Sequence, residues 1–469
     1  MTPTPSPASP GSEAPAPPAP AASPRRAPAV LRPLLAVLGR VRRNPGRTLA
    51  ALLLIALIAF GLSVAGIQLW AGYHFRAARK ALDRYHTLEA GEHLQNCLRV
   101  WPNDPDVLFL AARAARRAGR YDDAEEFLNR CQERRGRDDE ISLERALLTA
   151  EGGDVDDVLK FCTAKVEARD PESPLILEAL ARGLLRDYRL AEADWAVRTW
   201  QERQADDPMG HLLRGRVAHE SYADTTAIAA FRRALEIDPE LDEARDRLAA
   251  VLVETNQPQE ALPHLEYLCR SRPNDAGLSV RLAECRDLLG EQDEAARLLD
   301  EVLARHPDLP AALARRGKLA LHAGQFAEAE GLLRRATAAA PWDANLLQQL
   351  QLCLEQSGQT DKARAMDPQV KRAKADLERL EKLVTEDIRK EPLNPDPQYE
   401  AGKVLLRIGS YSEGLRRLQK AVRLSPKYGE VRVKANEALA DFYKRAGSAA
   451  KAAEHRRLAR EAAGDRPKE

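Results

Sequence analysis

The sequence predicts an all-α chain in which one long stack of helix pairs follows a single membrane-spanning helix. Three observations support this fold class: a 34-residue period marked by proline, a long run of residues without charge near the N-terminus, and only 5% aromatic residues. A chain rich in alanine, leucine, arginine and glutamate is typical of helices. A fixed period of about 20–50 residues is the sequence pattern of a solenoid.

The overall charge excludes two classes of protein. The 469 residues include 72 Lys and Arg against 71 Asp and Glu, a formal net charge of +1. A nucleic-acid-binding protein shows a clear basic excess, so we expect no nucleic-acid partner. With 30% charged residues, most of the chain is water-soluble, which excludes a protein with many membrane spans. The bias toward arginine and alanine suggests a bacterial source.

The N-terminal segment is rich in proline. Residues 1–30 contain ten prolines, separated mostly by Ala and Ser. Proline is excluded from helix interiors, and so few large apolar side chains cannot offset the entropy of the chain. We therefore predict a disordered, Arg-containing cytoplasmic tail over 1–47. A short basic amphipathic helix over Leu34–Arg43 on the membrane surface is an alternative for its last part.

A charge-free run predicts a transmembrane helix over 48–72. Its core, Leu49–Trp70, has 22 residues. This length corresponds to about 33 Å at the helical rise, close to the ~30 Å of the hydrocarbon layer. Trp70 and Tyr73 stand where an interfacial aromatic belt is expected. A buried helix of a soluble protein and a cleaved signal peptide are the alternatives.

The charges that flank this run predict its orientation. Seven arginines precede it and four basic residues follow it closely. Basic residues favour the cytoplasmic side. We therefore expect a single-pass protein of the cytoplasmic membrane, with its N-terminus in the cytoplasm and the helical stack on the periplasmic or outer side. Residues 1–47 carry seven Arg against Glu13, which leaves a net charge of −5 for the rest.

Prolines and small residues carry the repeat. Each of four prolines follows an alanine by twelve residues, and a further small residue stands twelve before that alanine. The positions are Pro239, Pro273, Pro307 and Pro341, then Ala227, Ala261, Ala295 and Ala329, then Gly215, Ala249, Ala283 and Gly317. Small residues let two helices cross closely, and proline ends the second helix. The spacing resembles the tetratricopeptide repeat, a helix–turn–helix unit, and implies a right-handed solenoid of about 10–11 units.

The repeat pattern varies along the chain and divides it. The copies match well over 208–343 and are divergent over 73–207. Residues 395–469 hold C-terminal repeats and a capping helix. Between these parts, 344–394 holds one repeat plus an extra half-repeat helix.

The extra helix follows from the interval of 51 residues between Pro341 and Pro392, which is one and a half periods. Apolar residues recur at spacings of three and four over Val370–Lys390, at Val370, Ala373, Leu377, Leu380, Val384 and Ile388. We expect a short helix over 360–366, a break at Asp367-Pro368, and then this long helix packed inside the solenoid. Self-association through a coiled-coil seam is the alternative.

The motifs of common enzyme and metal sites are missing from the sequence. The phosphate loop, the GxGxxG and GxSxG turns and HExxH are all absent. None of the six cysteines forms a CxxC pair, which excludes zinc-ribbon and thioredoxin-like sites. We therefore expect no catalytic residue, cofactor, metal or small-molecule substrate. A disulfide between Cys269 and Cys285 and an enzyme with an unrecognised site are left as alternatives.

The resemblance implies a protein or peptide partner in the concave groove, which the first helix of each repeat lines in this family. By repeat position, the groove candidates are Arg216, His219, Asp246, Glu284, Lys318, His322, Gln348 and Glu355. Their mixed charges argue against a uniformly basic groove that captures a C-terminal carboxylate. They favour a polar or helical protein ligand that is selected by its charge pattern.

These observations together predict a non-enzymatic, membrane-anchored scaffold or adaptor for protein–protein interaction outside the cytoplasm. The alternative is an assembly or biogenesis factor that acts on a client protein in cytochrome maturation, secretion or envelope assembly.

Overall fold

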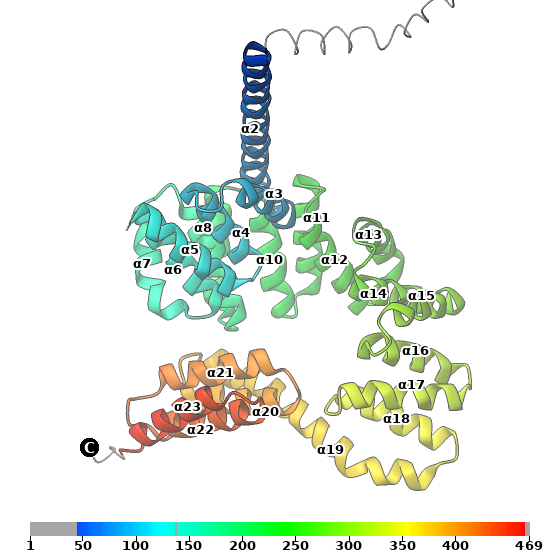
Figure 1. Ribbon diagram of the computed structural model, residues 1–469. Helices are drawn as coiled ribbons and strands as arrows, with labels where there is room; N and C mark the ends of the chain where they lie inside the picture. The colour runs from blue at the N-terminus through cyan, green and yellow to red at the C-terminus, as the bar shows by residue number, and fades with distance from the viewer. Residues whose placement is uncertain (1–44, 137, 465–469) are drawn as a thin grey trace, which may run out of the picture. The chain divides into compact units, whose positions relative to one another are not determined.

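The computed structural model describes residues 45–136 and 138–464 of the chain. The chain divides into two units, Met1–Gly72 and Tyr73–Glu469, and we name the second the helical unit. The predictions for the N-terminal tail lie outside the described residues, except at 45–47, which begin helix α2 (Pro45–Asp83) where a disordered tail was expected. Throughout the described ranges the regular elements are helices, which confirms the all-α class (Figure 1).

Helix α2 (Pro45–Asp83) carries the apolar run. Its segment Leu52–Asp83 is long and apolar enough to cross a membrane, and its most apolar window is not buried by the rest of the protein. Leucines such as Leu57 and Leu69 are about 70% exposed. A continuous exposed apolar surface of this kind is unfavourable in water.

The second unit is a succession of antiparallel helix pairs. The first helices of the pairs are α4 (Pro105–Arg117), α6 (Asp139–Gly152), α8 (Ser173–Arg186), α10 (Pro208–Glu220), α12 (Asp242–Glu254), α14 (Ala276–Leu288), α16 (Pro310–His322), α18 (Ala344–Gln356), α20 (Pro395–Arg407) and α22 (Glu430–Arg445). The second helices are α3 (Thr87–Val100), which packs on the end of α2, and α5 (Tyr121–Arg135), α7 (Val155–Glu167), α9 (Leu190–Arg203), α11 (Asp224–Ile237), α13 (Pro258–Ser271), α15 (Gln292–Arg305), α17 (Phe326–Ala339), α19 (Thr360–Lys382), α21 (Tyr411–Leu424) and α23 (Ala449–Ala462).

Local sequence explains where these helices begin and how closely they pack. Helix α10 starts at Pro208 because Asp207 caps it, accepting hydrogen bonds from the backbone N–H of Met209 and Gly210 at 2.9 and 3.3 Å. At the crossing of α10 and α11, a Cβ on Gly215 would stand 2.4 Å from the ring of Phe231. The close approach of two helices therefore requires the small residue at this repeat position.

Helix α19 corrects the predicted break at Asp367-Pro368, because it runs without interruption from Thr360 to Lys382. The amide of Gln351 on α18 donates to the Asp367 carboxylate at 2.6 Å and holds this turn. Beyond the proline, Val370 and Ala373 are buried against α18. Burial on both sides of Pro368 stabilises the helical path despite the missing N–H.

A π-helix, η1 (Leu383–Ile388), follows α19 directly. Its wider turn shifts the register, so that Leu383 is buried where the spacing of three and four predicted Val384. Leu383 and Ile388 pack on Ala401 and Val404 of α20. The inserted segment thus packs within the stack at both ends, as expected, while Leu377 near its middle is 47% exposed.

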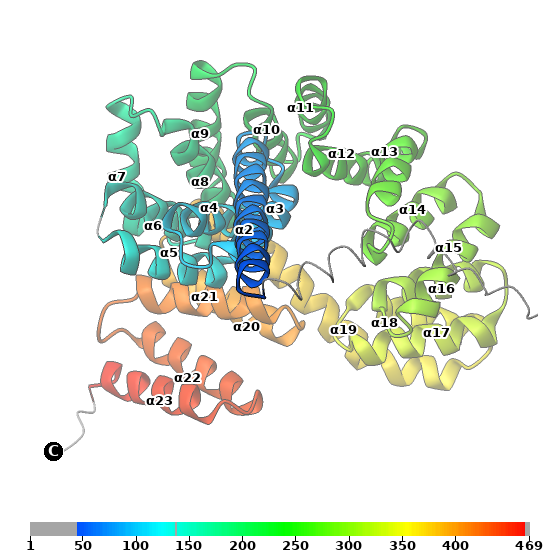
Figure 2. The same cartoon turned by 45° about the horizontal axis from the view of Figure 1, so that its top comes forward.

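The helical unit closes on itself through α21. The guanidinium of Arg416 donates to Asp187, at the end of α8, at 2.8 Å and to the Arg186 carbonyl at 3.0 Å. Lys420 also binds Asp187, and Arg423 binds Asp154. Both views place α21 beside the group of helices that includes α8 (Figures 1 and 2).

Candidate functional site

The first helices of the pairs form the inner face of the stack. Consecutive first helices contact one another, as α6 with α8, α10 with α12, and α14 with α16. Consecutive second helices make no comparable contacts in the ranges that the structure describes. Consecutive first helices are therefore closer together than consecutive second helices. This difference makes the stack curve, with the first helices on its concave side. The predicted groove candidates are all on this inner set.

A charge ladder runs along the inner face from α4 to α16. Carboxylates and guanidiniums of different first helices pair with each other. Asp246 on α12 pairs with Arg281 on the next first helix, α14, at 2.7 Å, whereas Arg182 on α8 reaches past α10 to Glu243 on α12 at 3.4 Å. Arg216 shares Glu243 at 3.8 Å. The charge ladder comprises Arg117, Glu178, Arg182, Arg216, Glu243, Asp246, Arg281, Glu284 and Arg315.

At its N-terminal end the ladder adjoins a fully buried ionic cluster. Arg116 donates to Glu144 at 2.7 Å and also binds Glu151. Burial alone favours the neutral acid, but Arg116 and Arg113 hold the pKa of Glu144 below its usual range. Farther along, burial lowers the pKa of Arg216 to about 10, since one shared carboxylate only partly offsets its desolvation. These groups are committed to contacts within the protein.

The ladder stops at α16 because the next repeat lacks its arginine. Gln349 holds the repeat position of Arg281 and Arg315, and its Oε1 is buried without a hydrogen-bond partner in the part of the chain that the structure describes. Lys318, which holds the repeat position of Glu284, makes no ion pair with any described residue. We name the inner surface beyond this point the open stretch, which consists of Lys318, His322, Gln348, Gln349, Leu352 and Glu355.

The structure therefore separates the eight predicted groove residues into two groups. The first group, Arg216, His219, Asp246 and Glu284, has partners within the chain; His219, for example, lies 2.9 Å from Asp224 and 3.4 Å from Glu254. The side chains of the second group make no hydrogen bond or ion pair with described residues. This group consists of Lys318, His322, Gln348 and Glu355. The second group is available to a ligand.

Sequence reasoning missed two members of the open stretch, Gln349 and Leu352. Leu352 is 45% exposed although it is apolar. The sequence does contain a signal for both residues, because Gln349 and Leu352 stand 34 residues after Arg315 and Lys318 and so replace charged residues at the same repeat positions. Comparing repeats position by position would have shown where charge is replaced by neutral side chains.

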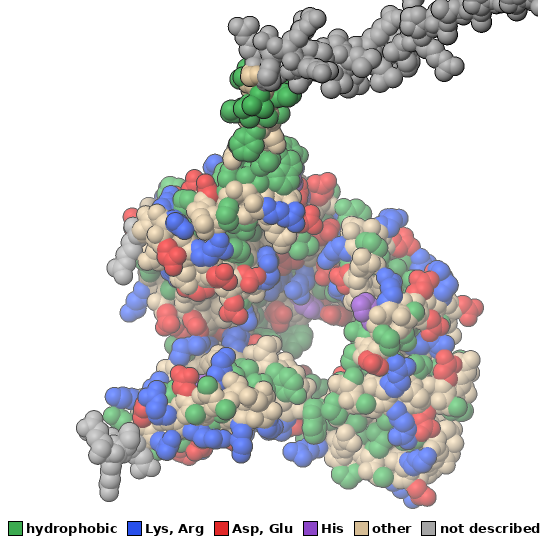
Figure 3. Space-filling model, in the orientation of Figure 1, with side chains coloured by type: hydrophobic (Ala, Val, Ile, Leu, Met, Phe, Trp, Pro, Cys, Tyr) green, Lys and Arg blue, Asp and Glu red, His purple; other side chains and the backbone are tan. Residues whose placement is uncertain are grey.

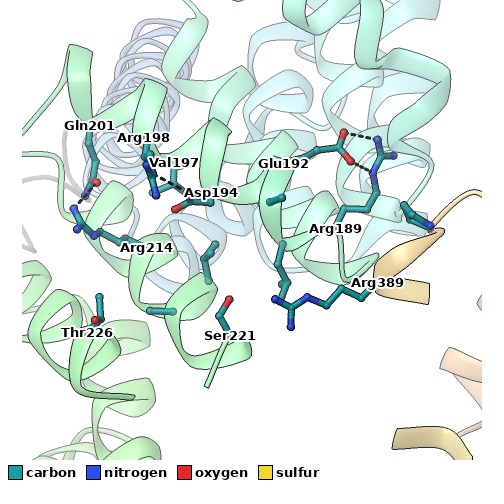
Figure 4. A pocket seen from close by; sticks show the side chains of 15 residues that line it. Arg189, Glu192, Asp194, Val197, Arg198, Gln201, Arg214, Ser221, Thr226 and Arg389 are labelled. Carbon is teal, nitrogen blue, oxygen red and sulfur yellow. Dashed lines mark hydrogen bonds and ion pairs between the residues drawn. The ribbon is translucent and has the colours of Figure 1, made fainter. Parts of the chain in front are cut away.

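A polar hollow of about 790 Å³ lies elsewhere in the helical unit, where Arg389 and Pro392 approach α9 and α10 (Figure 4). Its arginines are matched by neighbouring acceptors. Arg189 donates to Glu192 at 2.7 and 2.5 Å, and Arg198 pairs with Asp194 at 2.8 Å. The hollow thus offers less unpaired charge than its arginine content suggests.

The cysteines are free thiols, including Cys269 and Cys285, so the structure contains no disulfide between them. Cys285 donates to the carbonyl of Pro258 at 3.2 Å, and burial raises its pKa to about 11. Such a thiol is poorly reactive, because the thiolate is the nucleophile. In the described ranges, His, Cys, Asp and Glu do not gather in groups of three or more that could hold a metal ion.

Comparison with known proteins identifies repeats in two parts of the chain. Residues 81–147 and 252–319 match the family model of the tetratricopeptide repeat. No curated protein matched the chain.

Solved structures of other repeat proteins are similar to parts of the chain. PilW, described as a widely conserved type IV pilus biogenesis factor, is 19% identical over 42% of this chain and 91% of its own, with a TM-score of 0.39. YrrB, described as a TPR protein with an unusual peptide-binding site, is 22% identical over 40% of this chain and 96% of its own, with a TM-score of 0.35. PilF of Pseudomonas aeruginosa is 16% identical over 43% of this chain and 92% of its own, with a TM-score of 0.38.

Proposed function

We propose that this chain, which contains tetratricopeptide repeats, is a non-enzymatic membrane-anchored adaptor that binds a protein partner on the inner face of its solenoid. Helical repeats of this kind generally serve as protein-interaction scaffolds. The observation that carries the proposal is the end of the charge ladder at α16, beyond which the side chains of Lys318, His322, Gln348 and Glu355 have no partner among the described residues. Partner charges matched to Lys318 and Glu355 would set the specificity.

The anchor in this proposal is the apolar part of α2. Its exposed leucines and its length suit a bilayer. The distribution of basic residues favours an N-terminus in the cytoplasm and a solenoid on the other side of the membrane. Visible faces of the helical unit mix basic and acidic side chains, whereas apolar side chains cover α2 (Figure 3). A protease-protection assay on intact cells and on spheroplasts tests this orientation. Digestion of the solenoid only after lysis of the cytoplasmic membrane would contradict it.

Site-specific photocrosslinking in cells tests the binding site. A photoreactive amino acid at His322 or Glu355 should give a discrete crosslinked product, because both side chains are exposed within the open stretch. The matched control is Arg270, an exposed residue of the second helix α13. Equal product from Arg270, or none from either inner position, would contradict an inner-face site.

A charge reversal sharpens the same experiment. Lys318→Glu combined with Glu355→Lys should reduce the crosslink from His322 without changing thermal stability, since neither side chain has a partner within the described chain. The identity of the captured protein then separates the two roles considered. A client that awaits assembly or cofactor insertion would indicate a biogenesis factor, and a stable signalling or structural protein would indicate an adaptor.

A further inference from the structure

A second hollow, of about 700 Å³, lies where the inserted helix meets the C-terminal repeats. Residues from the α17–α18 turn and from α19, α20, α21 and α22 line it. We name it the aromatic cleft, and its lining residues used here are Trp342, Arg372, Arg407, Tyr411, Phe442 and Arg445. None of them belongs to the open stretch.

Large aromatic side chains are exposed in the aromatic cleft. Trp342 is 45% exposed and Tyr411 is 53% exposed. The ring of Tyr411 lies 5.6 Å from that of Phe442, which supports it from α22. Exposed tryptophan and tyrosine beside arginine form the residue combination that dominates the binding energy of protein interfaces.

The charge of the aromatic cleft is positive. Asp376 is its acidic residue, and Arg407 neutralises it with two hydrogen bonds of 3.1 and 2.5 Å. Arg372 makes no hydrogen bond or ion pair with described residues. The Nε of Arg445 donates a hydrogen bond to the Asp441 carbonyl at 3.3 Å, and its two terminal nitrogens make no hydrogen bond or ion pair with described residues. Two guanidiniums are thus available to an anionic ligand beside an apolar surface.

Size and charge together define the occupant. A hollow of this volume holds one or two side chains with a short piece of backbone. The N-terminal segment of this chain is a poor occupant, because residues 1–47 carry a net charge of +6. We propose that the aromatic cleft binds an acidic peptide segment of a partner protein, with one aromatic side chain against Trp342 and Tyr411 and carboxylates on Arg372 and Arg445. This inference rests on the proposed adaptor function and names the chemistry of its partner.

The test is fluorescence anisotropy with the full chain in detergent micelles. The probe is a labelled twelve-residue peptide with one Phe flanked by Asp and Glu. Matched peptides replace the Phe by Ser, or the acidic residues by Lys. The acidic Phe peptide should bind, and its affinity should fall with added salt because charges contribute. No binding of this peptide, or equal binding of the Lys peptide, would overturn the proposal.

Variants of the chain locate the peptide. Trp342→Ala should weaken binding about tenfold or more, as for a central interface tryptophan. Arg372→Ala with Arg445→Ala should weaken it similarly and reduce its dependence on salt. The controls are Trp195→Ala, at a 42% exposed tryptophan on α9, and Arg364→Ala, at an exposed arginine on α19; neither should change the affinity.

The outcomes distinguish this inference from the adaptor function itself. If the arginine variant weakens binding but Trp342→Ala does not, the cleft is a simple anion site and the proposal is wrong. If no cleft variant matters while His322 still crosslinks a partner in cells, only the peptide site is refuted. Loss of that crosslink from all inner positions would refute the adaptor function instead.

Discussion

The guanidinium of Arg416 lies 2.8 Å from the carboxylate of Asp187, although the two residues are 229 positions apart in the sequence. Asp187 is fully buried and binds the ammonium group of Lys420 as well. In addition, the guanidinium of Arg417 lies 5.2 Å from the ring centre of Tyr188. Repeats of a solenoid ordinarily contact only their neighbours. This ionic contact therefore acts as a closure between distant repeats.

Replacing Asp187 should open the closure. Asp187→Asn leaves Lys420 buried without its counter-charge, and breaking a buried ion pair typically costs about 3–5 kcal/mol. The stack can avoid this cost by separating α21 from α8 and hydrating the cations. We expect distances between spin labels at Asp157 and Lys427, two exposed positions on either side of the closure, to lengthen and broaden.

The control for the closure is Asp194→Asn. Asp194 pairs with Arg198 on its own helix at the surface, and such pairs contribute at most about 1 kcal/mol. Its spin-label distances should match those of the unmodified chain. An unchanged distribution in Asp187→Asn would show that the closure does not depend on this carboxylate.

Gly183→Ala should destabilise the helical unit. A Cβ at this position would stand 2.0 Å from the backbone oxygen of Ala150 and 2.8 Å from Val155. Overpacking of this kind costs about 1–3 kcal/mol or more, because a backbone atom cannot move aside as a side chain does. Thermal unfolding followed by circular dichroism should show a lower melting temperature.

The matched control is Gly331→Ala on α17, where a Cβ meets nothing within 4 Å. Alanine is favoured over glycine in a helix by about 1 kcal/mol, so this variant should be neutral or slightly stabilising. A melting temperature for Gly183→Ala equal to that of Gly331→Ala would contradict the close contact between α6 and α8.

Much of the fold could be predicted from the sequence, because each helix pair depends mainly on residues within its own repeat. Small residues mark where paired helices cross, and aspartate with a nearby proline marks the start of several first helices, as the Gly215 crossing and the Asp207 cap show. The continuation of helix α19 through Pro368 could not be predicted from the sequence. It depends on a hydrogen bond from Gln351 and on burial of Val370, which are contacts with another helix.

The candidate site was only partly predictable for the same reason. Repeat position identified which helices form the inner face, but charge pairing between helices decides which side chains are free. Arg216 and Lys318 hold the same repeat position, yet Arg216 pairs with Glu243 whereas the ammonium group of Lys318 pairs with none of the residues that the structure describes. The 34-residue pattern does not predict the closure at Asp187, because this contact joins repeats that are distant in sequence.

Ala261→Glu tests the register of the repeats. Ala261 is fully buried on α13 within the main hydrophobic cluster. A carboxylate there is either ionised without a counter-charge or protonated at a cost, and the expected loss is about 4 kcal/mol or more. Ala261→Ser should cost much less. We expect the Glu variant to melt far lower or to be degraded in cells, and a melting temperature near that of the unmodified chain would contradict the register.

Acidification should loosen the first repeat through a histidine pair. The Nδ1 atoms of His74 and His93 are 2.7 Å apart, which requires at least one neutral ring. The ring of Tyr73 packs edge-on against both, and Glu89 lies 3.7 Å from His93 Nε2. Burial, and then the charge of His93, lower the pKa of His74 below 6.5.

The direction of the effect follows from proton linkage. Between the folded and the ordinary pKa of His74, the unfolded chain binds more protons than the folded one. The stability that this group supports is therefore complete above pH of about 6.5 and is lost as the pH falls through the folded value. Hydrogen exchange in α3, corrected for intrinsic rates, should be faster at pH 5.5 than at pH 7.5. His93→Gln should reduce this difference, whereas His306→Gln, at an exposed distant histidine, should leave it unchanged; a difference that persists in His93→Gln would exclude the pair as its origin.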